Sequence, residues 1–513
     1  MKNRIIHMGG RLLRMVLSAV LGALVMVIVF LVIELNNRPD LKVWHTAELE
    51  QEFRADSGLI DFDQYLELEE RLFEQLDKRV YSRIDPQDQR DINRYYRGSR
   101  SDPGNWPTNW NRSFVMPSAA PEIGVLLLHG MSDSPYSLRS IGEMLHDRGA
   151  YVIGLRVPGH GQAPSGLLGV EWEDMAAAVR LAMAELAQKS GGRPLYIVGY
   201  SNGGALAVQY TLDSLVVNDL APVDGLVLLS AEIGISKLAA LAKWQERLGH
   251  LLGLEKLAWN ALLPEYDPWK YGSFALNAGK QAYRVTQEIQ KQLNGRSTDG
   301  TLNRMPPVLA FQSVVDSTVT APALVHNFLD RLPAKTGDQA DAVRRNELVL
   351  FDINRFADIH SLIKQHPSAW IEPMLYSEEH TFTLTLLSNS SKTEQQLYAY
   401  SRAPGSASVE TCETGLFWPE DVYSLSHVAL PFPPDDPVYG QDKPANSQGI
   451  FLGKVALRGE KNILHVPATD MLRLRYNPFH SYMRQRMLSF LGFEVNVNNA
   501  CKTRAPTPPA TDT

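Results

Sequence analysis

A serine stands between two glycines in the pentapeptide Gly199-Tyr-Ser-Asn-Gly203. An apolar run at 194–198 precedes it, and a run of helix-forming residues at 204–212 follows it. A serine in a tight turn between a strand and a helix is typical of a nucleophile elbow, which exposes the hydroxyl and needs glycines where a Cβ would clash. The pattern therefore predicts that Ser201 is a nucleophile, and the alternative is a flexible turn.

Acyl transfer from such a serine also needs N–H groups that stabilise the oxyanion. The backbone N–H of Asn202 would lie at a helix N-terminus and is the first candidate. A second apolar run, 124–128, ends in His129-Gly-Met-Ser. A strand that ends in His-Gly supplies a donor from the next residue, so the N–H of Met131 is the second candidate. We expect His129 itself to be structural.

Three motifs together resemble the α/β-hydrolase superfamily: Leu-Leu-Leu-His-Gly at 126–130, Arg-Val-Pro-Gly-His-Gly at 156–161 and Gly-Tyr-Ser-Asn-Gly-Gly at 199–204. The resemblance is to its monoacylglycerol lipase, lysophospholipase and serine aminopeptidase branch, and it covers about 120–335. It implies a mostly parallel central sheet flanked by helices, with a cap over the site. The loop at 156–161 either lines the pocket or forms a rigid turn.

The alternation of apolar runs with helical segments indicates the same α/β class independently. The runs are 124–128, 151–155, 194–198, 224–230, 307–313 and 347–353.

A serine nucleophile needs a base, and the base needs an acid that orients it. The superfamily order is serine, acid, histidine. Asp316 follows an apolar run at 305–313, and Val319 stands three residues after it, as in the similar enzymes. We predict Asp316 as the acid, with Glu232, after the run at 224–230, as the alternative.

The base is the harder assignment, because about a hundred residues with further predicted strands follow 347–353. The candidates are His326, His360, His366, His380, His427, His465 and His480. We predict His427, which lies in a loop before a proline-rich stretch. His480 is the rival, in the first turn of a terminal helix that we expect Asn477 to cap and that ends near 490–491.

The N-terminus contains an uncharged, largely apolar run, Met15 to Ile33, long enough to span a membrane. Four basic residues precede it: Lys2, Arg4, Arg11 and Arg14. The positive-inside rule predicts a cytoplasmic N-terminus and a domain outside, which in a bacterium is the periplasm. A cleaved signal peptide is the alternative, but the run is long and no small-x-small site follows it.

We expect a basic N-terminus at 1–14, a membrane anchor at 15–34 and a helical and loop extension at 35–119. The α/β-hydrolase domain would occupy 120–500, with a helical cap at about 236–294 and a C-terminal elaboration at about 354–470. A disordered tail would follow at 501–513. The apolar first part of the cap either lines an acyl site or packs on the core.

Composition excludes other classes of function. The 513 residues are 44% hydrophobic and carry a net charge of −7, with 50 basic and 57 acidic residues and no basic stripe beyond the extreme N-terminus. This excludes a nucleic-acid-binding protein. Cys412 and Cys501 form no metal motif, and we expect two free thiols, with a disulfide as the alternative in an oxidising compartment.

The sequence therefore predicts a membrane-anchored serine hydrolase that cleaves carboxylic esters without a metal or organic cofactor. The substrate stays open among lysophospholipids, monoacylglycerols and other small acyl esters. A thioesterase or a serine aminopeptidase would use the same triad. A non-catalytic binding module with the same fold is the alternative from a different class.

Overall fold

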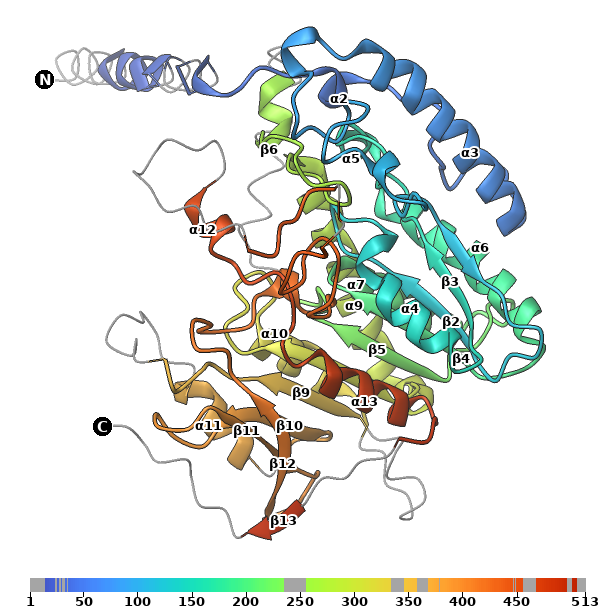
Figure 1. Ribbon diagram of the computed structural model, residues 1–513, viewed down its shortest axis with the longest axis vertical. Coiled ribbons are helices and arrows are strands. Elements are labelled where there is room, and N and C mark those ends of the chain that lie inside the picture. Colours follow the sequence, from blue (N-terminus) through green and yellow to red (C-terminus); the bar gives the residue numbers. More distant parts are fainter. Residues whose placement is uncertain are drawn as a thin grey trace, which may run out of the picture.

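An 11-stranded sheet runs through the molecule in the order β1-β3-β2-β4-β5-β8-β9-β10-β11-β12-β13 (Figure 1). The computed structural model describes residues 14–23, 25–26, 29, 33–34, 36–234, 255–333, 346–357, 368–377, 379–445, 447, 449–454, 467–495 and 501–504. The strands of this sheet are β1 (Phe114–Met116), β2 (Gly124–Leu128), β3 (Tyr151–Leu155), β4 (Leu195–Tyr200), β5 (Gly225–Leu229), β8 (Val308–Ser313), β9 (Glu347–Phe351), β10 (Thr383–Asn389), β11 (Gln396–Arg402), β12 (Val409–Phe417) and β13 (Cys501–Arg504).

Neighbouring strands are parallel from β3 to β10 and antiparallel at the two ends of the sheet. Each of the six apolar runs named from the sequence forms one of these parallel strands, within two residues at either end. The prediction of a mostly parallel sheet flanked by helices is therefore confirmed. The sequence signal was strong because a parallel strand is covered on both faces and is apolar along its whole length.

Helices cover both faces of the sheet. The α-helices of the described residues are α2 (Val43–Thr46), α3 (Phe62–Arg79), α4 (Arg139–His146), α5 (Gly166–Gly169), α6 (Trp172–Ser190), α7 (Asn202–Ser214), α9 (Leu276–Thr298), α10 (Ala321–Asn327), α11 (Ser368–Tyr376), α12 (Ala468–Met471) and α13 (His480–Phe490). Val125 and Leu127 of β2 belong to a core shared with α4 and α13, whereas Leu126 and Leu128 belong to a core shared with α6, α7 and α9. This alternation follows from the two-residue period of a strand.

Asp61 caps the N-terminus of α3, where its carboxylate accepts a hydrogen bond from the Gln64 N–H at 2.8 Å. Its buried face includes Phe62, Tyr65 and Leu72. In Figure 1 α3 runs along the outside of the helical layer beside α6. The extension before the sheet is thus packed onto the domain.

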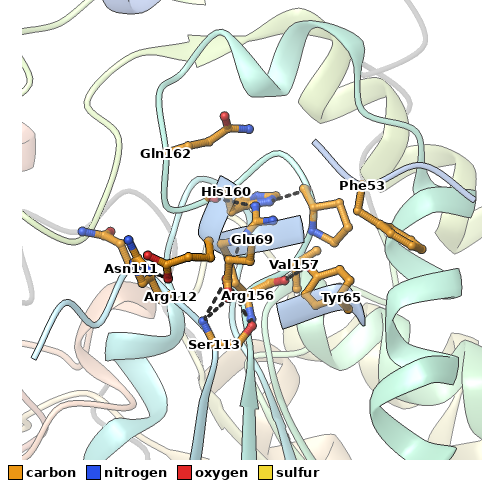
Figure 2. A network of polar contacts seen from close by, with 12 residues as sticks. Phe53, Tyr65, Glu69, Asn111, Arg112, Ser113, Arg156, Val157, His160 and Gln162 are labelled. Carbon is orange, nitrogen blue, oxygen red and sulfur yellow. Dashed lines mark hydrogen bonds and ion pairs between the residues drawn. The ribbon is translucent and has the colours of Figure 1, made fainter. Parts of the chain in front are cut away.

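Arg156, at the end of β3, connects this extension to the sheet. Its guanidinium is buried and pairs with Glu69 of α3 at 2.8 Å and with Glu52 at 3.0 Å. Glu69 also accepts a hydrogen bond from the Ser113 N–H at 3.0 Å. Figure 2 shows Glu69, Arg156 and Ser113 converging at this point. The start of the loop at 156–161 is therefore tied to the extension by buried ion pairs.

Part of the predicted anchor at 15–34 lies outside the described residues, and its described residues are helical. Within the ranges given above, no helix is both long enough and apolar enough to cross a membrane. Also outside the described residues are the basic segment 1–13, the apolar first part of the predicted cap at 235–254, and His360, His366 and His465.

The predicted C-terminal elaboration extends the sheet. The apolar run near 381–387 forms β10, which pairs with β9 in parallel, and β11 to β13 follow in antiparallel order. The first four residues of the tail expected to be disordered form β13.

The expectation of two free thiols is wrong, because Cys412 is disulfide-bonded. The chain has one other cysteine, Cys501, which is the register partner of Cys412 in the β12–β13 pair. Spacing along the sequence could not reveal this, because the two positions meet only through strand pairing.

Candidate active site

Ser201 lies at the sharp turn from β4 into α7 with φ 54° and ψ −118°. A positive φ is uncommon for a residue with a side chain and is tolerated where the surrounding structure enforces it. A Cβ on Gly203 would collide with the Leu128 backbone carbonyl, and a Cβ on Gly199 would lie 2.6 Å from the Gly203 carbonyl oxygen. Both glycines of the pentapeptide are therefore required by close backbone contacts.

The structure brings Ser201, His427 and Asp316 into one hydrogen-bonded series. The Nε2 atom of His427 lies 3.2 Å from Ser201 Oγ, and Nδ1 lies 2.8 Å from Asp316 Oδ2. A carboxylate accepts, so Nδ1 carries the proton and Nε2 is free to accept from the serine hydroxyl. Both distances lie within the reach of a general base and its orienting acid. His427 begins a short 3₁₀ turn, His427–Ala429.

Asp316 is held as an anion by its donors. Its Oδ1 accepts from the N–H groups of Thr318 at 2.8 Å and Val319 at 2.9 Å, and its Oδ2 also accepts from Gln312 at 2.9 Å. Burial would raise the pKa of Asp316, but the hydrogen bond and positive charge of His427 and the two backbone donors hold this pKa below its ordinary value. A carboxylate that stays ionised can orient and stabilise an imidazolium.

The two candidate oxyanion donors are unoccupied backbone N–H groups beside Ser201. Asn202 is the first residue of α7, where an N–H has no partner inside the helix. Within the described ranges, neither this N–H nor that of Met131 donates a hydrogen bond. The Met131 turn packs closely on the nucleophile, since a Cβ on Gly130 would lie 3.1 Å from Ser201 Cβ.

His129 shapes this turn and takes no part in proton transfer. Its Nε2 accepts from the Val157 N–H at 3.0 Å, so its Nδ1 carries the proton and donates to the Gly130 carbonyl at 2.9 Å. Burial, followed by the neighbouring His160, lowers its pKa well below the ordinary value. His129 is therefore a neutral link between the turn after β2 and the loop after β3.

None of the other described histidines forms a hydrogen bond with Ser201 in the described part of the chain. His480 is the first residue of α13, and burial, followed by the charge of Arg484, lowers its pKa to about 3. The helix begins after a cap at Phe479, while Asn477, the cap expected from the sequence, accepts from the Phe479 N–H at 2.9 Å. His326 and His380 both lie beside Asp330, at 3.4 Å and 2.8 Å.

Glu232, the alternative acid, follows β5 and contacts Ser201 through the backbone. Its backbone N–H donates to the Ser201 carbonyl at 3.0 Å, and its Oε2 has no hydrogen-bond partner among the described residues. Burial and then the charge of Asp316 raise its pKa to about 7. No described hydrogen bond joins it to His427, whose Nδ1 is engaged by Asp316.

The segment between Leu262 and Phe274 covers the site and was not recognised from the sequence. It connects β6 (Trp259–Ala261) and β7 (Phe274–Ala275), a separate two-stranded sheet. The Tyr271 N–H donates to the Ser132 carbonyl at 2.8 Å, next to the Met131 turn. The only sequence signal was its place within the predicted cap. Of the apolar first part of the predicted cap, the structure describes only the end, where Leu257 and Leu262 are buried.

A pocket of about 220 Å³ opens beside the three residues. Ser132, Tyr200 and Val428 line it, and they are the chain neighbours of Met131, Ser201 and His427. No group of three or more His, Cys, Asp or Glu placed to hold a metal ion occurs within the part of the chain that the structure describes.

Comparison with known proteins locates the matching region. Residues 119–340 match the family described as serine aminopeptidase, S33. This is less than half of the chain, and it ends before the segment that carries His427. No curated protein matches the chain.

Similar solved structures include those of three lipolytic enzymes. The monoacylglycerol lipase of Paleococcus ferrophilus is 20% identical over 47% of this chain and 88% of its own, with a TM-score of 0.34. A soluble variant of the monoglyceride lipase of Saccharomyces cerevisiae is 15% identical over 47% of this chain and 82% of its own, with a TM-score of 0.34. A structure from the work on the metagenome-derived lipolytic enzymes LipS and LipT is 22% identical over 44% of this chain and 83% of its own, with a TM-score of 0.34. Similarity at this level does not extend to activity or substrate.

Proposed function

The chain has the α/β-hydrolase fold, and on that premise we propose that it is a serine hydrolase that cleaves carboxylic esters. The observation that supports this function is the series Ser201–His427–Asp316, with hydrogen bonds of 3.2 Å and 2.8 Å, at an elbow whose glycines are sterically required. Unpaired N–H groups beside the nucleophile add a place for an oxyanion.

In the proposed reaction, Ser201 Oγ attacks the ester carbonyl while His427 Nε2 takes the hydroxyl proton. The carbonyl oxygen becomes an oxyanion that accepts from the N–H groups of Met131 and Asn202. Asp316 stabilises the imidazolium by accepting from Nδ1–H. The imidazolium then gives its proton to the departing alkoxide, so that an alcohol leaves and an acyl-serine remains. Water repeats the sequence with the same base and releases the acid and the free serine.

The test is ester hydrolysis by the purified protein and by Ser201→Ala. With p-nitrophenyl butyrate, kcat should fall on the order of 10³-fold or more, because the variant keeps only the oxyanion donors and binding. Equal rates for the two proteins would contradict a serine hydrolase and favour a non-catalytic binding module. Faster cleavage of an aminoacyl p-nitroanilide or of a thioester would favour the aminopeptidase or thioesterase alternative on the same residues.

We also propose that the residues at 15–34 anchor the chain, with the hydrolase domain on the outer side of the membrane. The uncharged run of 19 residues from Met15 to Ile33 supports an anchor. The disulfide-bonded Cys412 supports an oxidising compartment, where disulfides persist. The whole chain should stay in the membrane fraction after a high-salt wash, and added protease should reach the domain only from outside. A shortened mature form in the soluble fraction would contradict retention of the anchor.

A further inference from the structure

The pocket beside Ser201 has charged side chains in a lining that is otherwise largely apolar. Its charged lining side chains are Asp133, Asp267, Lys270, Asp470, Arg473 and Arg475. Lys270 comes from the segment between β6 and β7, whereas Arg473 and Arg475 come from the segment between α12 and α13. Two regions about two hundred residues apart therefore place cations on one cavity.

One oxygen of each inner aspartate already accepts hydrogen bonds. Asp267 Oδ1 accepts from the Tyr439 hydroxyl at 2.6 Å, the Trp269 N–H at 2.9 Å and the Lys270 N–H at 3.2 Å. Asp133 Oδ1 accepts from the Ser134 N–H at 2.8 Å. These bonds hold both carboxylates in the lining, and no described hydrogen bond engages the Oδ2 atom of either one.

The donors, by contrast, are largely unused. Within the described ranges, neither the ammonium of Lys270 nor the guanidinium of Arg473 makes a hydrogen bond or an ion pair, and Arg475 donates to the Tyr266 hydroxyl at 3.2 Å. An ammonium has three donors and a guanidinium five. Burial lowers the pKa of Lys270, the attraction of Asp133 and Asp267 opposes this shift, and the charges of Arg473 and Arg475 add to it. Both cationic segments therefore bring unused donors to the pocket.

We propose that this pocket binds an anionic group, a carboxylate or phosphate, of the ester whose carbonyl reacts at Ser201. The proposal rests on the proposed function and names its substrate class. Oxygen anions supply several acceptors at once and pair well with guanidinium and ammonium groups. The volume of about 220 Å³ suits a small polar group, since pockets for drug-sized ligands are about 300–1,000 Å³. Asp470, whose carboxylate has no partner among the described residues, makes a cationic group the competing ligand.

The test compares three p-nitrophenyl esters of similar length at low ionic strength: the neutral valerate, the hydrogen glutarate and a trimethylammonio-butyrate. The glutarate should have the highest kcat/KM. Lys270→Met combined with Arg473→Met should lower kcat/KM for the glutarate by about 10- to 100-fold, mainly through KM, which is the size of one or two charged hydrogen bonds. The ratio of kcat/KM for the glutarate to kcat/KM for the valerate should fall with it, because the valerate has no charge for the two side chains to bind.

Lys291→Met is the matched control, because Lys291 is an exposed lysine paired with Glu288 on α9. It should leave all three rates unchanged. Inhibition of valerate hydrolysis by glutarate or by inorganic phosphate distinguishes a carboxylate site from a phosphate site. Preference for the neutral or cationic ester, or equal loss on all three esters in the double variant, would overturn the proposal.

Binding without turnover separates this proposal from the proposed function. Glutarate and phosphate are titrated calorimetrically into Ser201→Ala, with and without the two methionine substitutions. Binding that the substitutions abolish supports the anion pocket even if no ester is hydrolysed, in which case only the proposed function fails. Absence of binding by both anions, together with normal hydrolysis of the valerate, would overturn the pocket alone.

Discussion

Ser201 and His427 are held in place by contacts of different range. Ser201 is fixed by its own turn, in which glycine backbones pack against each other and against the end of β2. His427 is fixed by distant segments: Asp316 binds its ring, and the Tyr200 hydroxyl donates to its carbonyl at 3.4 Å. Asn477, just before α13, donates to the Leu430 carbonyl at 3.2 Å and so supports the turn after His427.

This difference gives the C-terminal elaboration a role in the proposed site. The proposed nucleophile and acid follow the parallel strands β4 and β8, whereas the proposed base comes from beyond β12. An isolated bridge between Ile353 and Ser424 returns the chain to the sheet just before His427. The region that matches the S33 family therefore contains two of the three residues, and the added region supplies the third.

The largest effect on activity is expected from removal of His427, the residue that distant segments hold in place. His427→Ala should lower kcat for ester hydrolysis by about 10³- to 10⁶-fold, because the serine then has no base. His480→Ala should leave kcat within a few-fold and cost about 1–3 kcal/mol in the free energy of unfolding, since this side chain is buried in packing. Steady-state kinetics and urea unfolding of both variants measure the contrast. Loss of activity in a well-folded His480→Ala, with His427→Ala active, would reverse the assignment.

A smaller effect is expected where the N-terminal extension supports the loop after β3. Glu69→Ala leaves the buried Arg156 with Glu52 as its one remaining carboxylate partner and should cost about 3 kcal/mol in the free energy of unfolding. Glu70→Ala is the matched control, because Glu70 is exposed and pairs with Arg112 at the surface. The control should cost less than about 1 kcal/mol.

Chemical unfolding of the two glutamate variants decides whether the extension belongs to the cooperative unit. A large loss for Glu69→Ala with one transition means that α3 and the sheet unfold together. Equal small losses would mean that the extension is docked loosely and that the Arg156 network contributes little to stability.

The sequence carried the local features of this molecule and few of the long-range ones. The elbow and the parallel strands could be predicted because each has a short, characteristic sequence pattern: glycines around a serine, and a continuous apolar run. The strand pairing that joins Cys412 to its register partner and the charged segment over the pocket depend on residues far apart in the chain. His427 was predicted from its place in a loop before a proline-rich stretch, and this context alone left His480 as a rival.

The smallest effect, on the pH dependence of stability, is expected at Glu232, next to Ser201. The pKa of Glu232 is about 7 in the folded protein, against an ordinary value of 4.5 in the unfolded chain. Below both values the carboxyl is protonated in both states and costs nothing. As pH rises from 4.5 through 7, the unfolded state loses its proton first, so the folded state loses stability by roughly 1–3 kcal/mol.

Glu232→Gln removes this titration. Its free energy of unfolding relative to the wild type should therefore increase between pH 5 and pH 8. Urea unfolding at several pH values measures the difference. A difference that is constant with pH would mean that Glu232 has an ordinary pKa and that its carboxylate is solvated.

The most direct test of the central claim is identification of the residue that reacts with a fluorophosphonate probe. The account predicts a single adduct on Ser201 by peptide mass spectrometry, absent in Ser201→Ala and slowed at least about a thousandfold in His427→Ala. An adduct on a different serine, or labelling of Ser201 at an unchanged rate without His427, would contradict the assignment of these two residues as nucleophile and base.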